Sequence, residues 1–140
     1  LGGVQIESDL GPDGHSDADV LIHALMDALL GAAGLRDIGY YFPPEDDQYK
    51  GISSMLLLEK VNFLLKERGL QAYNIDIMVI SETPKLKPHI DMMKANLQSI
   101  LEISLDRISI KATTNEMLGA IGRREGIAAQ AVVSVYEGEI

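Results

Sequence analysis

The sequence contains no cysteine, few basic residues and no long uninterrupted apolar run. Without cysteine, neither disulfides nor thiolate metal sites can form, so a bound metal would need histidine or carboxylate ligands. Only 12 lysines and arginines oppose 21 acidic residues, and the resulting net charge of −9 argues against nucleic acid as a partner. No apolar segment has the length of a membrane-spanning helix, and we expect neither a membrane anchor nor a signal peptide.

The amount of apolar sequence is sufficient for one core. With 140 residues, of which 46% are hydrophobic, the sequence predicts a single domain over residues 1–140. The first residue is Leu1 rather than methionine, and we expect that a further N-terminal segment precedes it.

The segment from Gly14 to Asp27 predicts a buried helix. Ser16, followed three residues later by Asp19, is typical of a capping box, so the helix is expected to begin there. From Val20 to Ala33 nearly every residue is apolar, which leaves no solvent-facing side and indicates a helix buried on most sides.

His23 and Asp27 interrupt this apolar run and share one helix face with Asp19. In one interpretation, His23 is a core histidine held by Asp27 or by a backbone carbonyl. In the other it is a metal ligand whose second ring nitrogen is held by Asp27 or Asp19. His15, at the start of the helix, where free N–H groups favour anions, supports a functional role for this segment.

The remaining pattern predicts an α+β fold. Strands are expected at 4–6, 74–80, 108–114 and 127–136, and helices at 51–69, beginning near Ser53 or Ser54, and at 89–101. We expect a mixed four-stranded sheet with helices on one face, in a layering like that of chorismate mutase or ferredoxin, and with the last two strands paired antiparallel.

Two of the predicted loops carry charge. The acidic segment from Phe42 to Asp47 is either a solvated connection or a flap over a site. The segment from Ser81 to Pro88 has Lys85 and Lys87 between two prolines, at a strand end that precedes a helix. These lysines serve either solubility or the binding of an anion.

Several short motifs together resemble one enzyme family, the 2-C-methyl-D-erythritol 2,4-cyclodiphosphate synthases. The resemblance runs from Gly2 almost to the C-terminus and lies in the order and spacing of the pieces. They are Gly3-Val4, residues 15–20, residues 23–31, Asp37-Ile38-Gly39, Phe42-Pro43, Pro84-Lys85 with Pro88-His89, residues 111–116, and Gly122-Arg123 with Glu125-Gly126.

The resemblance implies a homotrimeric phosphorus–oxygen lyase of the non-mevalonate route to isoprenoids and terpenoids. Such an enzyme converts 4-diphosphocytidyl-2-C-methyl-D-erythritol 2-phosphate to 2-C-methyl-D-erythritol 2,4-cyclodiphosphate and CMP, by metal-assisted attack of one phosphate on the other. Its active sites lie between subunits, and its location is the bacterial cytoplasm or, in a eukaryote, the plastid stroma.

The resemblance also implies metals. Zinc or manganese would be bound by the histidine matching His23 and by an Asp-x-His pair on the first strand, and magnesium would accompany the substrate diphosphate. No Gly-x-Asp-x-His motif stands upstream of Gly14, so two of the expected ligands have no counterpart in this sequence.

The family's site residues are carried over by position. The implied catalytic residues are His15, which contacts the sugar phosphate, and Thr114, which steadies the reacting phosphate. The implied substrate-binding residues are His15, Ser16, Asp37, Ile38, Gly39, Phe42, Asp46, Ser81, Pro84, Lys85, Leu86, Lys87, Thr113, Thr114, Asn115, Glu116 and Arg123. Arg123 has a second interpretation, as a structural partner of Glu125.

Two alternatives to the enzyme remain at this point. One is a trimeric binding or assembly protein that keeps the fold and an anion pocket without turnover. The other is a small acidic metal-binding domain with no preference for cytidine nucleotides.

Overall fold

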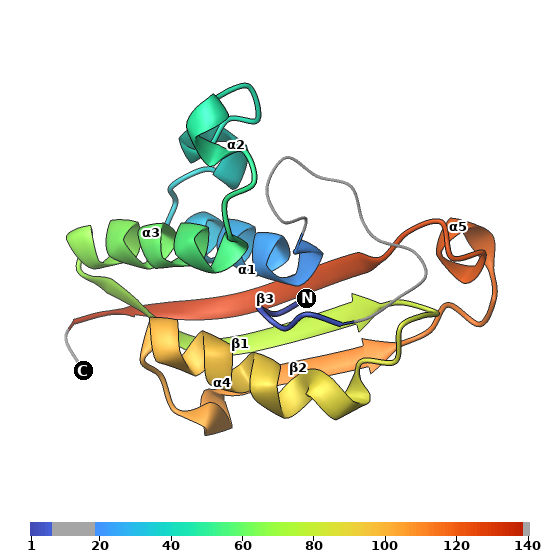
Figure 1. Cartoon of the computed structure of the whole chain (residues 1–140). Helices are drawn as coiled ribbons and strands as arrows, with labels where there is room; N and C mark the ends of the chain where they lie inside the picture. The colour runs from blue at the N-terminus through green and yellow to red at the C-terminus, as the bar shows by residue number, and fades with distance from the viewer. Residues whose placement is uncertain (7–18, 139–140) are drawn as a thin grey trace.

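Three strands form one mixed sheet within the residues that the computed structural model describes, 1–6 and 19–138. β1 (Leu70–Ile80) lies between the other two strands, parallel to β2 (Ile108–Thr113) and antiparallel to β3 (Ala128–Glu137). Ile80 pairs with Thr113 on one side and with Ala128 on the other. The carboxyl ends of β1 and β2 and the start of β3 therefore meet at one end of the sheet (Figure 1).

The predicted pairing of the last two strands is wrong, because β3 pairs with β1 and not with β2. A hairpin needs a short turn, whereas residues 114–127, which include the short helix α5 (Gly119–Gly122), separate these strands. This connection is long enough to pass β1. The match in length also favours the observed order, since β1 has 11 residues and β3 has 10, but β2 has only 6.

The predicted strand at residues 4–6 is also wrong, so the described residues contain three strands and not four. The backbone N–H groups of Gly2 and Gly3 donate to the carboxylate of Asp19, at 3.0 and 2.9 Å. These hydrogen bonds hold Gly2 and Gly3 against the start of a helix.

Three long helices cover one face of the sheet: α1 (Val20–Ala32), α3 (Ser54–Glu67) and α4 (Ile90–Leu101) (Figure 1). On β1, Ile75, Ile77 and Val79 are fully buried beneath them, whereas the side chains of intervening residues are partly exposed. On β3, Val132 is 72% exposed. This alternation confirms the predicted helices on one face and leaves the other face of the sheet open.

α1 has the predicted buried face, but it also has a solvent-facing side at Asp27, Gly31 and Ala32, which the prediction missed, and it begins later than predicted. Its buried side chains, each with no exposed surface, are Leu21, Ile22, Leu25, Met26, Leu29 and Leu30. The N-cap is Asp19, whose carboxylate accepts from the N–H of Ile22 at 3.2 Å, so the helix starts at Val20. Ser16, the predicted cap, lies outside the described residues.

The other helices agree with prediction, and short ones occupy segments predicted as loops. α3 is capped by Ser53, as expected. The short elements are α2 (Ile38–Tyr41), α5 and three 3-10 helices, η1 (Asp47–Tyr49), η2 (Lys87–His89) and η3 (Leu105–Arg107). Among the described residues, no helix has both the length and the apolar character required to cross a membrane.

Candidate active site

His23 is fixed where α1 meets α3. Its Nε2 lies 3.0 Å from the hydroxyl oxygen of Ser54, the first residue of α3, and Ser54 is fully buried. Sequence reasoning named Asp19 and Asp27 as partners of this imidazole and missed Ser54. The sequence did predict a helix start at Ser53 or Ser54, and therefore a serine hydroxyl at the first turn of α3. It did not indicate that this hydroxyl would face His23.

The two predicted carboxylate partners have other roles. Asp19 caps α1 and accepts from Gly2 and Gly3, whereas Asp27 Oδ1 accepts from the backbone N–H of Ile38 at 2.9 Å. The hydrogen bond from Ile38 attaches the start of α2 to the exposed side of α1. The prediction that Asp27 holds His23 is therefore corrected: Asp27 orders the segment that follows the helix.

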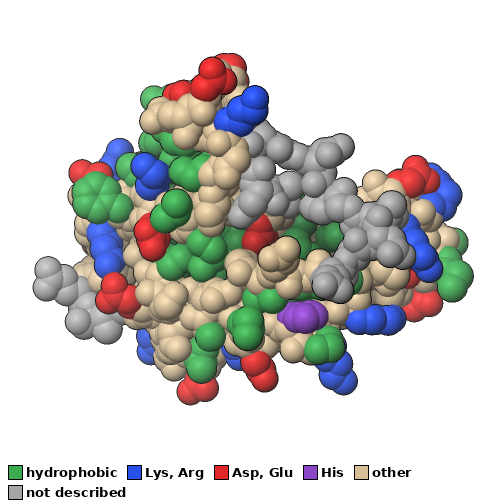
Figure 2. Space-filling model, in the orientation of Figure 1, with side chains coloured by type: hydrophobic (Ala, Val, Ile, Leu, Met, Phe, Trp, Pro, Cys, Tyr) green, Lys and Arg blue, Asp and Glu red, His purple; other side chains and the backbone are tan. Residues whose placement is uncertain are grey.

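The acidic segment after α1 is ordered by its own side chains. Asp37 caps α2 by accepting from the N–H of Tyr40 at 3.1 Å, and Asp46 caps η1 by accepting from Gln48 at 3.1 Å. Phe42 and Tyr49 pack edge to face, with ring centroids 5.3 Å apart. The predicted loop from Phe42 to Asp47 is confirmed: it connects α2 to η1, which begins at its last residue, and the aromatic contact joins its first residue to η1. Figure 2 shows acidic side chains on a protrusion above the helix layer.

His23 and this segment enclose a small pocket. Its volume is about 180 Å³, and its lining residues are His23, Ile38, Gly39, Phe42, Pro44, Tyr49 and Leu57. Four of the predicted site residues, Ile38, Gly39, Phe42 and His23, are therefore brought together. Sites for small molecules usually have volumes of roughly 300–1,000 Å³, so this pocket can hold only part of a substrate the size of a nucleotide derivative.

A second group of predicted residues lies at the carboxyl ends of β1 and β2. Ser81 follows β1 directly, and its backbone N–H donates to the carbonyl of Thr113 at 2.9 Å, which continues the strand pairing by one residue. The Ser81 hydroxyl donates to the carbonyl of Thr83 at 2.7 Å. Leu86 is buried and anchors the segment, whereas Pro84 is half-buried, and Lys85 and Lys87 are exposed on either side of Leu86.

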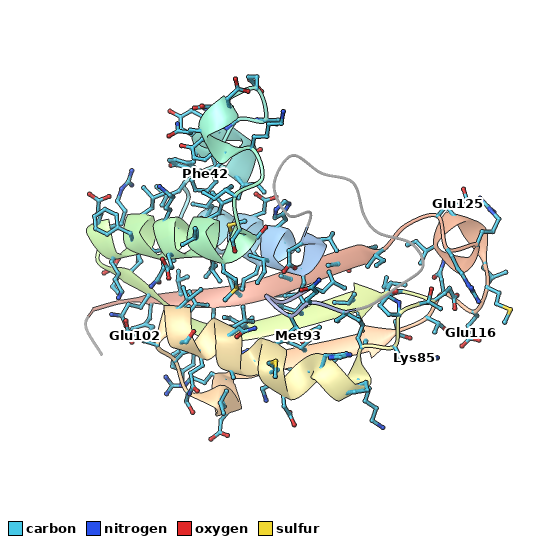
Figure 3. The ribbon with its side chains drawn as sticks, in the orientation of Figure 1. Phe42, Lys85, Met93, Glu102, Glu116 and Glu125 are labelled. Atoms are coloured by element: carbon cyan, nitrogen blue, oxygen red, sulfur yellow. The ribbon has the colours of Figure 1, made fainter. Side chains whose placement is uncertain are left out.

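The turn after β2 presents hydroxyl and amide groups at the same end of the sheet as Lys85 (Figure 3). Thr114 is half-buried, and its hydroxyl oxygen accepts from the N–H of Glu116 at 3.3 Å. The Thr113 hydroxyl donates to the carbonyl of Thr114, and the Asn115 amide donates to the carbonyl of Leu118 at 2.8 Å. Glu116 is exposed. The two threonine hydroxyls and the segment that carries the lysines thus lie at the same end of the sheet.

Arg123 forms an ion pair with Glu125, and both side chains are more than half exposed. The predicted contact between Arg123 and Glu125 is therefore present, and it leaves both interpretations of Arg123 open. Figure 3 shows Glu125 at the same end of the molecule as Lys85 and Glu116.

One chain does not bring the two groups together. In Figure 3, Phe42 lies above the helix layer, whereas Lys85 and Glu116 lie at the far end of the sheet. None of the residues from 81 to 123 lines the pocket beside His23. His15 and Ser16, the predicted contacts to the sugar phosphate, lie outside the described residues.

The predicted metal centre is not completed by the described residues. Within residues 1–6 and 19–138, no three histidine, aspartate or glutamate side chains converge in a way that would hold a metal ion. His23 supplies one imidazole, and its Nε2 already faces the Ser54 hydroxyl. A catalytic zinc usually has three protein ligands, so the described part of the chain does not fit the metal by itself.

Comparisons with known proteins agree with the resemblance seen in the sequence. The family model described as YgbB matches residues 1–136. A curated relative from Synechococcus elongatus, named 2-C-methyl-D-erythritol 2,4-cyclodiphosphate synthase, is 60% identical over 132 residues, covering 94% of this chain and 82% of its own.

Solved structures give the same result for the fold. A bifunctional IspDF from Campylobacter jejuni superposes with a TM-score of 0.94 and 44% identity, covering 99% of this chain; this chain spans only 37% of the bifunctional one. A 2C-methyl-D-erythritol-2,4-cyclodiphosphate synthase in its CDP-bound form superposes with a TM-score of 0.87 and 35% identity, covering 96% of this chain and 87% of its own.

Proposed function

The chain belongs to the YgbB family, and from this premise we propose how its two groups of residues divide the work of the reaction. It is a cyclodiphosphate synthase: it converts 4-diphosphocytidyl-2-C-methyl-D-erythritol 2-phosphate to 2-C-methyl-D-erythritol 2,4-cyclodiphosphate and CMP, in isoprenoid biosynthesis. Family membership therefore favours the enzyme over a binding protein without turnover or a simple metal-binding domain. Residues 1–140 act as one domain of this kind.

The proposed active site is shared between two copies of the chain. One half is the pocket of His23, Ile38, Gly39 and Phe42, together with Asp37 and Asp46. The resemblance also assigns His15 and Ser16 to this half, and both lie outside the described residues. This half takes the methylerythritol part of the substrate. The other half is formed by the residues at the ends of β1 and β2, and it takes the CDP part. The observation that carries this proposal is the separation of Phe42 from Lys85 and Glu116 within one chain (Figure 3).

The second half is suited to a nucleoside diphosphate. Lys85 and Lys87 are exposed, and Figure 3 shows Lys85 at the same end of the molecule as Glu116, in the turn that carries Thr114. This end of the sheet therefore offers both cationic and hydrogen-bonding groups to a phosphate. The chain as a whole carries a net charge of −9, and phosphate binding therefore depends on such a local group. The buried Leu86 fixes the backbone on which both lysines stand.

The reaction needs positioning more than covalent help from the protein. An oxygen of the 2-phosphate attacks the β-phosphorus of the diphosphate, and the bond between that phosphorus and the oxygen bridging to the α-phosphate breaks. CMP leaves with this oxygen, and the new P–O–P link closes the ring. The protein must hold two anions in line and offset their repulsion, for which Lys85, Lys87 and the hydroxyl of Thr114 are placed.

We further propose that the assembly is a homotrimer. A face of one copy that meets a different face of the next is a heterologous contact, and such contacts form a closed ring when the rotation closes. The open face of the sheet, with Val132 72% exposed, is available for this packing. That the ring contains three subunits is implied by the resemblance to the family.

Divalent metals, zinc or manganese at His23 and magnesium on the substrate diphosphate, stay within the proposal as family properties. Their remaining ligands would come from groups beyond the described residues, including the substrate phosphates. The proposed location is the bacterial cytoplasm, or the plastid stroma in a eukaryote.

Mixing two inactive variants tests the shared site. Asp37→Ala disables the first half and Lys85→Ala the second, and each homotrimer should release little CMP. In a randomly mixed trimer, about a quarter of the sites combine two intact halves, so activity should recover to about a quarter of the wild-type value. No recovery after verified subunit exchange, or a monomer by light scattering at micromolar concentration, would contradict the proposal.

A further inference from the structure

Glu82 joins the two segments that form the CDP half of the proposed site. It stands one residue after Ser81 in the segment that carries Lys85 and Lys87. Its Oε1 accepts from the backbone N–H of Asn115 at 3.1 Å and from that of Met117 at 2.8 Å, in the turn after β2. A single carboxylate oxygen thus connects the lysine segment to the turn that carries Thr114.

The turn held by Glu82 has an unusual backbone. Glu116 and Met117 are adjacent residues other than glycine, with φ of 53° and 61°, in the left-handed region that such residues rarely occupy. A conformation of this kind persists only where surrounding contacts hold it in place. Met117 is 83% exposed, so the packing of its side chain is not what holds it.

The contacts that do hold the turn come from two directions. On one side, Gly122 approaches the backbone of Met117 so closely that an added Cβ would lie 2.2 Å from the Met117 carbonyl carbon. From the lysine segment, Glu82 fixes the N–H groups of Asn115 and Met117. Between these two N–H groups lies that of Glu116, which donates to the hydroxyl oxygen of Thr114 at 3.3 Å. The orientation of this hydroxyl is therefore linked to the Glu82 contact.

The charge of Glu82 works against the ligand that the site is proposed to take. A carboxylate beside a diphosphate repels it, and the chain is already strongly acidic. Both hydrogen bonds use one oxygen, and the carbonyl oxygen of a glutamine can accept the same two N–H groups. Position 82 therefore requires a side-chain oxygen that is long enough to accept from both N–H groups, and this oxygen need not be charged.

We propose that Glu82 is a positioning residue for the reaction: it clamps the turn after β2 to the lysine segment, so that Thr114 and Lys85 are aligned before the substrate binds. It touches neither the substrate nor the reacting atoms. The proposal rests on the assignment of Thr114 and Lys85 to the CDP half of the site.

Three substitutions of Glu82 separate the effect of side-chain length from the effect of charge. Glu82→Gln keeps the acceptor and removes the charge, Glu82→Asp keeps the charge and is one methylene too short, and Glu82→Ala removes both. We expect CDP affinity, measured by calorimetry, to fall about tenfold in the Asp and Ala variants, as for lost hydrogen bonds that order a loop. We expect kcat for CMP release to fall as well. The Gln variant should stay within about twofold of the wild type in both.

A second site and a control complete the test. Glycine adopts positive φ without strain, so Met117→Gly should reduce the loss caused by Glu82→Ala in a double-mutant cycle. Glu67, an exposed carboxylate on α3, provides the control: Glu67→Gln and Glu67→Ala should leave affinity and kcat unchanged. Trimer mass by light scattering identifies any variant that fails to assemble, and the Asp and Gln variants still decide the question if the Ala variant does.

The outcomes are distinct. If the Gln variant is as defective as the Asp variant, or if the Asp and Ala variants match the wild type, the clamp is refuted. If instead the wild-type protein itself fails to bind CDP, the proposed CDP half of the site is refuted, and the proposed role of Glu82 is refuted with it.

Discussion

Asp27, on the exposed side of α1, accepts a hydrogen bond from the backbone N–H of Ile38 at 2.9 Å and so connects the main helix to the segment that closes over His23. The contact joins residues 11 positions apart, across the end of the helix. Ile38 also lines the pocket beside His23. The carboxylate thus determines where one wall of this pocket stands.

Asp27→Ala should raise KM about fivefold and leave kcat nearly unchanged, since it loosens a binding wall through one hydrogen bond. Asp27→Asn keeps an oxygen acceptor and should behave like the wild type. Steady-state kinetics of CMP release measures both. An equal fall in kcat with unchanged KM in the Ala variant would instead place Asp27 among the groups that act in the transition state.

Asp19 is the residue on which the start of α1 depends for stability. It is 5% exposed, and its carboxylate accepts from three backbone N–H groups, those of Gly2, Gly3 and Ile22. Asp19→Ala removes a helix cap and leaves buried donors unpaired, so the free energy of unfolding should fall by about 2–3 kcal/mol.

Urea titration measures this loss. Ser53→Ala provides the control, because it removes an exposed cap with one hydrogen bond, at the start of α3, and should cost only about 1 kcal/mol. An Asp19→Ala variant as stable as Ser53→Ala would show that the N-terminal segment gains nothing from this carboxylate.

Thr114 is expected to act in the transition state. If its hydroxyl steadies charge that develops as the phosphates react, Thr114→Val should lower kcat roughly a hundredfold while CDP affinity stays nearly intact. Thr114→Ser retains the hydroxyl and should recover most of the activity. Calorimetry with CDP, run beside the kinetics, checks the distinction: an equal loss of affinity would make Thr114 an ordinary ligand contact.

Lys85 is expected to behave in the opposite way. Its exposed ammonium group attracts the diphosphate before reaction, so Lys85→Ala should weaken CDP binding and reduce the dependence of that binding on salt. Melting temperature should not change, because the side chain is exposed. Binding isotherms at low and high ionic strength measure the effect, and an unchanged salt dependence would exclude Lys85 from the phosphate site.

Much of this fold follows from local sequence patterns. The apolar run after Asp19, the alternation on β1 and the serines before α3 predicted the right elements, because helix periodicity, strand alternation and caps depend on near neighbours in the chain. Strand order did not follow in the same way. That β3 pairs with β1 depends on relative strand lengths and on a long connection, and neither is a local property.

The site was predictable in identity more than in contacts. Motif order named the residues, but the partners of those residues are contributed by other elements: Ser54 faces His23 from 31 positions away, and Glu82 reaches Met117 across 35. Asp27 was assigned to His23 because the two lie one turn apart. Its actual partner is a backbone N–H that only the fold brings close.

The metal site is where this sequence differs most from the family pattern, because the expected Asp-x-His pair has no counterpart in it. His23 is the only histidine that the resemblance assigns to the metal, and no three histidine, aspartate or glutamate side chains converge within residues 1–6 and 19–138. We therefore expect weak zinc binding, with water, a carboxylate or substrate phosphate completing the coordination. His23→Ala should abolish this residual binding without unfolding the protein, because the cap and the apolar sides of α1 do not depend on metal. His89→Ala, in η2, should leave it unchanged. Calorimetry with zinc alone decides the matter: tight one-to-one binding that survives His23→Ala would mean that the metal is held elsewhere.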